Sequence, residues 1–245
     1  MSGDYQHLRL VKSAEEIEWL RVGCELTDSA IEALSRGLRP GLSEHQLADM
    51  CERAYVGRGG RTHIHYFGVT PMAEPGISVP AQFTSNREVR AGDAVSCEIS
   101  ASYWDYTGQV VGTFAVAAAP TAQYSELHKV AEAAFDAITA RLRPGATAVE
   151  LIAASAVIEE SGYTIRDDLI HGFVGGYLPP VLGSSSRQLA AVPDLTLEAG
   201  MTLVVQPNVI TPDETAGVQT GELVLVGADG PERLHRVQRG LLRTG

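Results

Sequence analysis

Glu98 is the residue of this chain best placed to do chemistry, because it is a carboxylate inside an apolar segment. Residues 94–100 are apolar and rich in β-branched side chains and follow a turn, which predicts a buried strand. Residues 103–106 form a polar hairpin tip, and a second apolar run over 109–117 begins with Gln109, eleven positions after Glu98. Burial without a counter-charge raises the pKa of a carboxyl group, so Glu98 is a candidate general acid or base.

An internal repeat supplies a second polar strand residue. The tetrapeptide Leu-Arg-Pro-Gly occurs at 38–41 and again at 142–145, each time between two helical patterns. Gln206 lies five residues after Met201, just as Glu98 lies five residues after Asp93. Two halves of about a hundred residues, each helix-helix-strand-strand, predict an α+β fold with pseudo-twofold symmetry. Glu98 and Gln206 are then expected to face each other across the axis.

Local signals place the elements that carry these residues. Residues 63–69 indicate a strand with His63 and His65 on one face, where they either line a site or lie on the solvated surface. We expect residues 1–12 to be a short lead and 13–245 a single domain, with halves of about 13–117 and 118–245. Capping boxes predict the starts of three helices, at Ser13–Glu16, Ser43–Gln46 and Thr147–Glu150.

Composition narrows the class of protein. The 245 residues are 44% apolar and 20% charged, which is typical of a globular protein with a hydrophobic core. A net charge of −11 argues against nucleic acid or an anionic membrane as partner. The three cysteines (Cys24, Cys51 and Cys97) form no CxxC pair, and no run approaches about 18 apolar residues. A reduced cytoplasmic protein is therefore expected.

Several segments together resemble the creatinase/aminopeptidase ("pita-bread") family, most closely the catalytic domain of aminopeptidase P and prolidase. The resemblance implies a pita-bread fold around a curved, mainly antiparallel sheet. It also implies that residues 9–17 match a linker into the catalytic domain, so a catalytic domain without its N-terminal partner is expected. The matching features are the turn at 91–93, the interval from Glu98 to Gln109, Ile170–Phe173, Val204–Pro207 and 217–222.

The resemblance also implies where metal ligands would lie. The peptidases of the family bind two metals with two Asp, two Glu and a His, and the matching positions here are Glu98, Gln109, Gln206, Gly221 and His171. Neutral amides are poor substitutes for carboxylates at divalent cations. We therefore expect no metal or other cofactor and no peptidase chemistry.

The expected function is then a metal-independent enzyme that acts on a small organic molecule by acid–base chemistry. Hydrolysis, elimination or dehydration, and isomerisation or cyclisation remain open, in a specialised biosynthetic or catabolic pathway. The expected partners are the small-molecule substrate and a second copy of the chain as homodimer. The catalytic candidates are Glu98 and His171, and the substrate-binding candidates are Gln109, Gln206, His63, His65, Tyr106 and Glu222.

Two alternatives remain at this point. The first is a non-catalytic pseudo-peptidase that presents the old cleft to a ligand or partner. For Gln109 and Gln206 a structural role is equally open, in which the pair fills the vacated metal cavity with mutual hydrogen bonds. The second is an Xaa-Pro aminopeptidase-like metallopeptidase with a degenerate metal site, in which a one-residue slip would replace Gly221 by Glu222. Such a slip turns the side chain to the opposite face of the strand.

Overall fold

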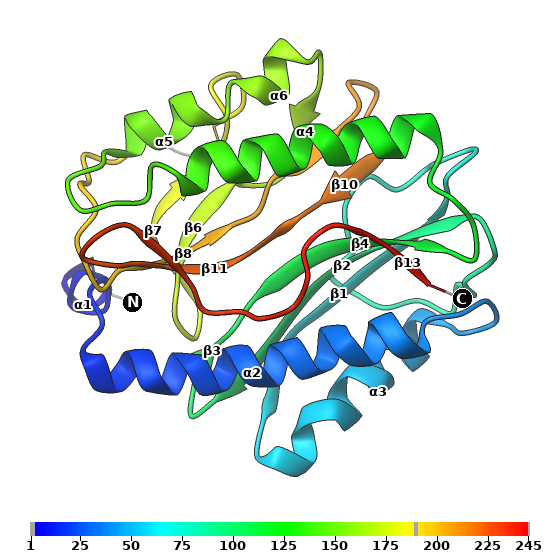
Figure 1. Cartoon of the computed structure of the whole chain (residues 1–245), viewed down its shortest axis with the longest axis horizontal. Helices are drawn as coiled ribbons and strands as arrows, with labels where there is room; N and C mark the ends of the chain where they lie inside the picture. Colours follow the sequence, from blue (N-terminus) through cyan, green and yellow to red (C-terminus); the bar gives the residue numbers. More distant parts are fainter. Residues whose placement is uncertain (1–2, 189–190, 245) are drawn as a thin grey trace.

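A curved, mainly antiparallel sheet runs through the centre of the molecule, with the helices packed along it (Figure 1). The structure is a computed structural model and describes residues 3–188 and 191–244. The main path of the sheet is β1-β2-β4-β11-β8-β6-β7. Its strands are β1 (Arg61–Pro71), β2 (Asp93–Tyr103), β4 (Val110–Val116), β11 (Gly221–Val226), β8 (Thr202–Val205), β6 (Ile170–Phe173) and β7 (Tyr177–Leu182).

Short strands extend this sheet and form a second one. Beside the main path, β3 (Tyr106–Thr107) pairs with β2, β12 (Pro231–Arg233) pairs with β11, and β13 (Leu241–Thr244) runs parallel to β4. The second sheet has the order β10-β9-β5. Its strands are β10 (Gly217–Gln219), β9 (Asn208–Ile210) and β5 (Thr164–Ile165).

The helices begin where the capping residues predict. Ser13, Ser43 and Thr147 each accept a hydrogen bond from the third helical residue, whose own side chain bonds back to the cap, so all three predicted capping boxes are confirmed. None of the helices described is long and apolar enough to cross a membrane. The helices are α1 (Gly3–Leu8), α2 (Ala14–Gly37), α3 (Glu44–Tyr55), η1 (Val56–Arg58), α4 (Ala122–Thr139), α5 (Ala148–Ala154) and α6 (Val157–Glu160).

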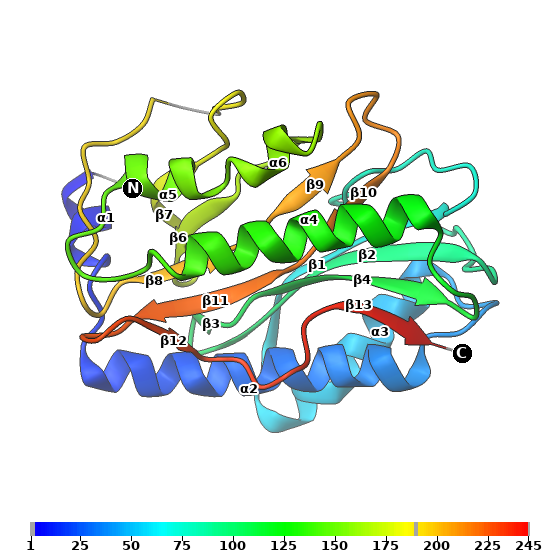
Figure 2. The same cartoon turned by 45° about the horizontal axis from the view of Figure 1, so that its top comes forward.

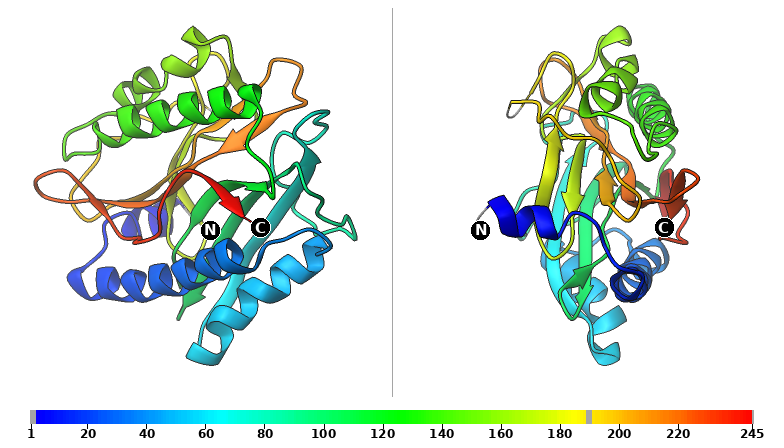
Figure 3. Two further views of the ribbon diagram at one scale, coloured as in Figure 1. Left: turned by 45° about the vertical axis from the view of Figure 1, so that its right-hand side comes forward. Right: turned by 90° about the vertical axis from the view of Figure 1, so that its left-hand side faces the viewer.

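The predicted two-half organisation is visible in the sheet and in the core. Strands β1, β2 and β4 are followed across the sheet by β11, β8 and β6, so each half contributes three successive strands to the centre. One apolar cluster joins α2 and α3 to the first set, and a second joins α4, α5 and α6 to the other. Helices α2 and α4 lie on the same side of the sheet in Figures 2 and 3.

Side-chain alternation along β2 decides which residues remain for a site. Val95, Cys97 and Ile99 belong to the apolar cluster under α2, so the residues between them point to the opposite face of the sheet. Glu98 is one of these and lies opposite Tyr66 of β1 and Val111 of β4 in the register. The fold therefore places the Glu98 carboxylate on the face that the long helices do not cover.

Candidate functional site

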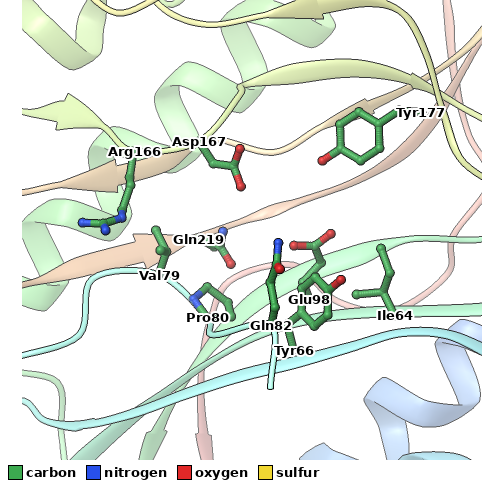
Figure 4. Close-up of a pocket in the computed structure, with 10 residues that line it drawn as sticks. All are labelled: Ile64, Tyr66, Val79, Pro80, Gln82, Glu98, Arg166, Asp167, Tyr177 and Gln219. Atoms are coloured by element: carbon green, nitrogen blue, oxygen red, sulfur yellow. The ribbon is translucent and has the colours of Figure 1, made fainter. Parts of the chain in front are cut away.

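A cleft of about 500 Å³ lies on this uncovered face (Figure 4). Ligand sites in proteins have volumes of about 300–1,000 Å³, so the cleft can hold a dipeptide-sized molecule. Charged and amide groups project into it from both halves of the chain. Its lining residues are Ile64, Tyr66, Val79, Pro80, Gln82, Glu98, Arg166, Asp167, Tyr177 and Gln219.

Glu98 is the carboxylate at the floor of the cleft. Its side chain is 8% exposed, and burial together with the nearby Asp167 and Asp168 raises its pKa to about 8. Asp167 lines the cleft as well, and burial next to Asp168 also raises the pKa of Asp167. Glu98 can therefore both accept and donate a proton near neutral pH, as the sequence predicts for a buried carboxylate.

A buried chain of hydrogen bonds connects Glu98 to His171. The amide nitrogen of Gln109 donates to Glu98 Oε1, and Gln109 Oε1 lies 3.4 Å from His171 Nε2. On the other side of the ring, His171 Nδ1 lies 2.7 Å from Asp168 Oδ2. The structure thus brings together Glu98, Gln109 and His171, with Asp168 orienting the imidazole.

Gln206, the residue directly after β8, joins the same network. Its Nε2 atom lies 3.3 Å from Asp168 Oδ2 and from the Asp168 carbonyl oxygen, while its Oε1 atom has no partner among the described residues. Gln206 is therefore linked to Glu98 only through Asp168, His171 and Gln109. Both glutamines are buried, but among the described residues Gln109 bonds to Glu98 and His171 and Gln206 bonds to Asp168, so the mutual hydrogen bonds expected of a pair that fills a vacated metal cavity are not formed.

Tyr177 separates His171 from the cleft. Its ring stacks on the imidazole with centroids 3.9 Å apart, and its hydroxyl lies 3.4 Å from Asp168 Oδ1. His171 is 0% exposed, whereas Tyr177 is 41% exposed and lines the cleft. Of the two catalytic candidates, Glu98 faces the cleft directly and His171 lies behind Tyr177.

His63 and His65 do not share a face, which corrects the sequence-based prediction. The register between β1 and β2 shifts between Thr62 and Ile64, so a β-bulge interrupts the alternation at His63. His65 points toward α3, where its Nε2 lies 2.9 Å from the Tyr55 hydroxyl and burial lowers its pKa to about 4. His63 instead packs edge-on against Phe173.

Tyr106 and Glu222 lie apart from the residues that line the cleft. The Tyr106 hydroxyl donates to Glu16 at 3.2 Å, within an aromatic group at the β2–β3 hairpin. The Glu222 carboxylate is fully buried and pairs with both Nε and Nη2 of Arg233, the latter at 2.7 Å. Neither side chain is among those that line the cleft.

Sequence reasoning missed most of the residues that complete the site. Asp167 and Asp168 are noticeable only as an acidic pair just before His171, a pattern that equally fits a charged loop. Asn208 fixes the position of this loop. Its Oδ1 accepts hydrogen bonds from the backbone N–H of Arg166 at 2.8 Å and from that of Asp167 at 2.9 Å. No local pattern predicts a contact between residues about forty positions apart.

Comparison with known proteins decides the family. The profile of metallopeptidase family M24 matches residues 18–228, which is most of the chain. The chain belongs to this family. The resemblance to the creatinase/aminopeptidase group is thereby confirmed.

Relatives of this M24 protein include dipeptidases. The Xaa-Pro dipeptidase of Pyrococcus furiosus is 26% identical over 236 residues, which cover 96% of this chain and 66% of the relative. The probable dipeptidase PepE of Mycobacterium tuberculosis is 29% identical over 230 residues, which cover 92% of this chain and 58% of the relative. The chain thus spans less than two-thirds of the length of these relatives.

Solved structures confirm the pita-bread fold. The Xaa-Pro dipeptidase from Bacillus anthracis superposes with a TM-score of 0.86 at 23% identity, covering 99% of this chain and 66% of that structure. The prolidase from Pyrococcus furiosus superposes with a TM-score of 0.83 at 23% identity, covering 96% of this chain and 68% of that structure.

These comparisons correct the expected function. The sequence-based prediction of a non-peptidase enzyme for a small organic molecule is wrong about the activity, because relatives that match almost the whole chain are named Xaa-Pro dipeptidase and probable dipeptidase. That prediction assumed that a protein without the metal ligands of the family also loses the family's type of substrate. The two properties are separate, since a cleft can keep its shape while residues at its floor change.

The metal that the family name implies does not fit the residues at the expected ligand positions. Glu98 and His171 are the only carboxylate and imidazole at these positions, and the neutral amide of Gln109 lies between them, donating to Glu98 Oε1 and placing its own Oε1 3.4 Å from His171 Nε2. A Cβ atom at Gly221 would lie 2.0 Å from the Val205 carbonyl oxygen, so no side chain can reach out from that position. Among the described residues no three His, Cys, Asp or Glu side chains form a group that could hold a metal ion.

Proposed function

We propose that this protein is a peptidase that acts on short peptides, with Xaa-Pro dipeptides as the first candidate substrates. Supporting this are the names of its relatives, a match that spans 92–96% of the chain, and a cleft of dipeptide size on the uncovered face of the sheet. The observation that carries the proposal is the Glu98 carboxylate at the floor of that cleft.

The groups around the cleft suit a zwitterionic peptide. Asp167 offers a carboxylate for a free amino group, and Arg166, which also pairs with Glu214 at 2.6 Å, offers a guanidinium for a carboxylate (Figure 4). The buried Oε1 atom of Gln219 has no partner among the described residues and is an acceptor for a peptide N–H group. The exposed face of Tyr177 provides an apolar surface for a prolyl ring.

Glu98 would carry the proton during hydrolysis. With a pKa of about 8, its carboxylate form is basic enough to accept a proton from an attacking water molecule, and its acid form can then protonate the leaving nitrogen. The side chains at the expected ligand positions do not fit a metal ion, so no step of this hydrolysis uses one.

The test is release of proline from Xaa-Pro dipeptides, compared with dipeptides that lack proline. It is run with chelator, without added metal, and with added Mn²⁺, Co²⁺ or Zn²⁺. We expect proline release by the wild-type protein and a loss of at least about 10²-fold in kcat for Glu98→Gln. Absence of hydrolysis under every condition contradicts the proposal.

The second candidate function is peptide binding without hydrolysis. It is favoured by the neutral side chains of Gln109 and Gln206 at two positions where the family's peptidases have acids. The two functions differ in one measurement: calorimetry with an Xaa-Pro dipeptide shows saturable binding in both cases, but the recovered peptide is intact only in the second.

A further inference from the structure

A second pocket lies outside the cleft, between the first turns of α2 and the β2–β3 hairpin. It has a volume of about 400 Å³ and is lined by Glu15, Glu16, Trp19, Trp104 and Tyr106, which we call the aromatic box. Helix α2 and strand β3 pack against each other, so the box joins two segments far apart in sequence (Figure 2). Both tryptophans of the chain lie in it.

The aromatic walls of the box meet nearly at right angles. The Trp19 and Trp104 rings have an interplanar angle of 83° and centroids 6.5 Å apart, and Tyr106 lies 6.3 Å from Trp19. Tyr103 stacks on Trp19 at 5.7 Å and fixes the orientation of that ring. A cation in this pocket can lie within about 6 Å of both ring centroids, the range over which an aromatic ring attracts a cation.

Trp104 is held in a costly position. Its side chain is 73% exposed, and its backbone has a φ of 50° at the hairpin tip, in the left-handed region that costs a non-glycine residue about 1–2 kcal/mol. Trp104 and Asp105 are the two central residues of the tight turn between the paired Tyr103 and Tyr106, and such a turn requires positive φ at both, which explains the backbone conformation. The turn does not explain the exposure of the Trp104 ring, which is understandable if the ring serves a ligand.

The charge of the box is negative. Glu15 is exposed and forms no ion pair with any residue in the described ranges. The Glu16 carboxylate accepts hydrogen bonds from the Ser13 backbone N–H at 2.8 Å and from the Tyr106 hydroxyl at 3.2 Å. Lys12 and Arg9 lie near the Glu16 end of the box: Lys12 donates to the Leu10 carbonyl and burial lowers its pKa to about 7, and Arg9 donates to the Val174 carbonyl.

We propose that the aromatic box is a binding site for a small methylated ammonium cation of the choline type. Aromatic faces attract weakly hydrated cations, and the nearby carboxylates complement the charge. The site is independent of the peptide cleft and of its chemistry.

The two tryptophans report directly on this site, since the chain contains no others. Choline chloride is titrated into the protein while tryptophan emission is followed, with sodium chloride at equal ionic strength as a control. The matched probe is the neutral isostere in which carbon replaces the quaternary nitrogen. We expect a saturable change in emission with choline and at least about fivefold weaker binding of the isostere.

Variants test whether choline binds in the aromatic box or to exposed aromatic side chains in general. Trp104→Ala is expected to weaken choline binding by about tenfold, followed through Trp19 emission and calorimetry, and Glu15→Gln by a few-fold. Phe83→Ala is the control, because Phe83 is 84% exposed and outside the box, and it should bind choline normally. Equal affinity for choline and its isostere overturns the proposal, as does unchanged choline affinity in Trp104→Ala.

Discussion

Glu98 and His171 sit on strands from different halves of the chain and are joined by one side-chain amide, that of Gln109. Because His171 Nδ1 bonds to Asp168, a second bond from Nε2–H to Gln109 Oε1 requires the imidazolium form. If the amide flips, its NH₂ group donates to a neutral His171 and its oxygen accepts from a protonated Glu98. The amide therefore favours one proton shared between the two residues.

The first prediction concerns pH and Glu98. Its pKa is raised from 4.5 to about 8, so the folded state retains a proton that the unfolded state loses in this interval. The stabilisation is fully present below pH 4.5 and is lost as pH rises to about 8, by up to roughly 1.4 kcal/mol per pH unit. Urea unfolding from pH 4 to pH 9 measures this slope, which Glu98→Gln should flatten.

Glu160→Gln is the control for this series, since Glu160 is exposed. It should leave the slope as in the wild-type protein. A wild-type slope that persists in Glu98→Gln shows that another group is responsible.

The second prediction concerns Gly221. Replacement by Ala puts a Cβ atom 2.0 Å from the Val205 carbonyl oxygen, and β8 and β11 must separate to accommodate it. We expect the free energy of unfolding to fall by about 1–3 kcal/mol or more, measured by urea unfolding. Gly112→Ala on the adjacent strand β4 is the matched control, because no atom outside its own neighbourhood lies within 4 Å of the added Cβ. Equal stability of the two variants contradicts the close approach.

The sequence predicts the strands and helices that carry the site better than it predicts the contacts of the side chains within the site. The interval from Glu98 to Gln109 spans one hairpin, and the pairing of β2 with β4 fixes both side chains near each other. The capping boxes are local hydrogen-bond patterns, so they predict helix starts without any knowledge of the tertiary fold.

Side chains whose direction depends on distant contacts could not be predicted in this way. A bulge at His63 breaks the expected alternation with His65, and no residue signals it. Glu222 turns to Arg233, eleven positions away on a neighbouring strand. Tyr177 covers His171 only because β6 and β7 pair with a register shift.

The third prediction concerns Asn208, which holds the acidic loop of the cleft. Asn208→Ala removes the acceptor of the Arg166 and Asp167 backbone N–H groups and leaves the buried Asp168 carbonyl without its donor at 2.9 Å, which together costs about 1–3 kcal/mol. We expect lower stability together with a higher KM for any dipeptide that the protein hydrolyses. Asn86, the other asparagine of the chain, is exposed, and Asn86→Ala should change neither quantity. Unaltered stability of Asn208→Ala would refute this role.

The fourth prediction concerns a buried ion pair between the C-terminal segment and α2. His235 Nδ1 lies 2.6 Å from Asp28 Oδ1, and both side chains are buried. Burial alone lowers the pKa of His235, but the neighbouring Cys24 and Asp28 raise it to about 10. The stabilisation from this imidazolium is fully present below pH 6.5 and is lost as pH rises to about 10.

Asp28→Asn keeps the shape of the side chain and removes the counter-charge of the imidazolium. We expect a loss of about 3–5 kcal/mol at pH 6, where the wild-type pair is ionised, and a smaller loss at pH 9 to 10. Asp105→Asn is the control, because its side chain is 82% exposed. Urea unfolding at both pH values gives the comparison. A loss that does not shrink with rising pH means that Asp28 acts through its hydrogen bond to the Arg236 backbone N–H, at 2.7 Å, rather than through the charge of His235.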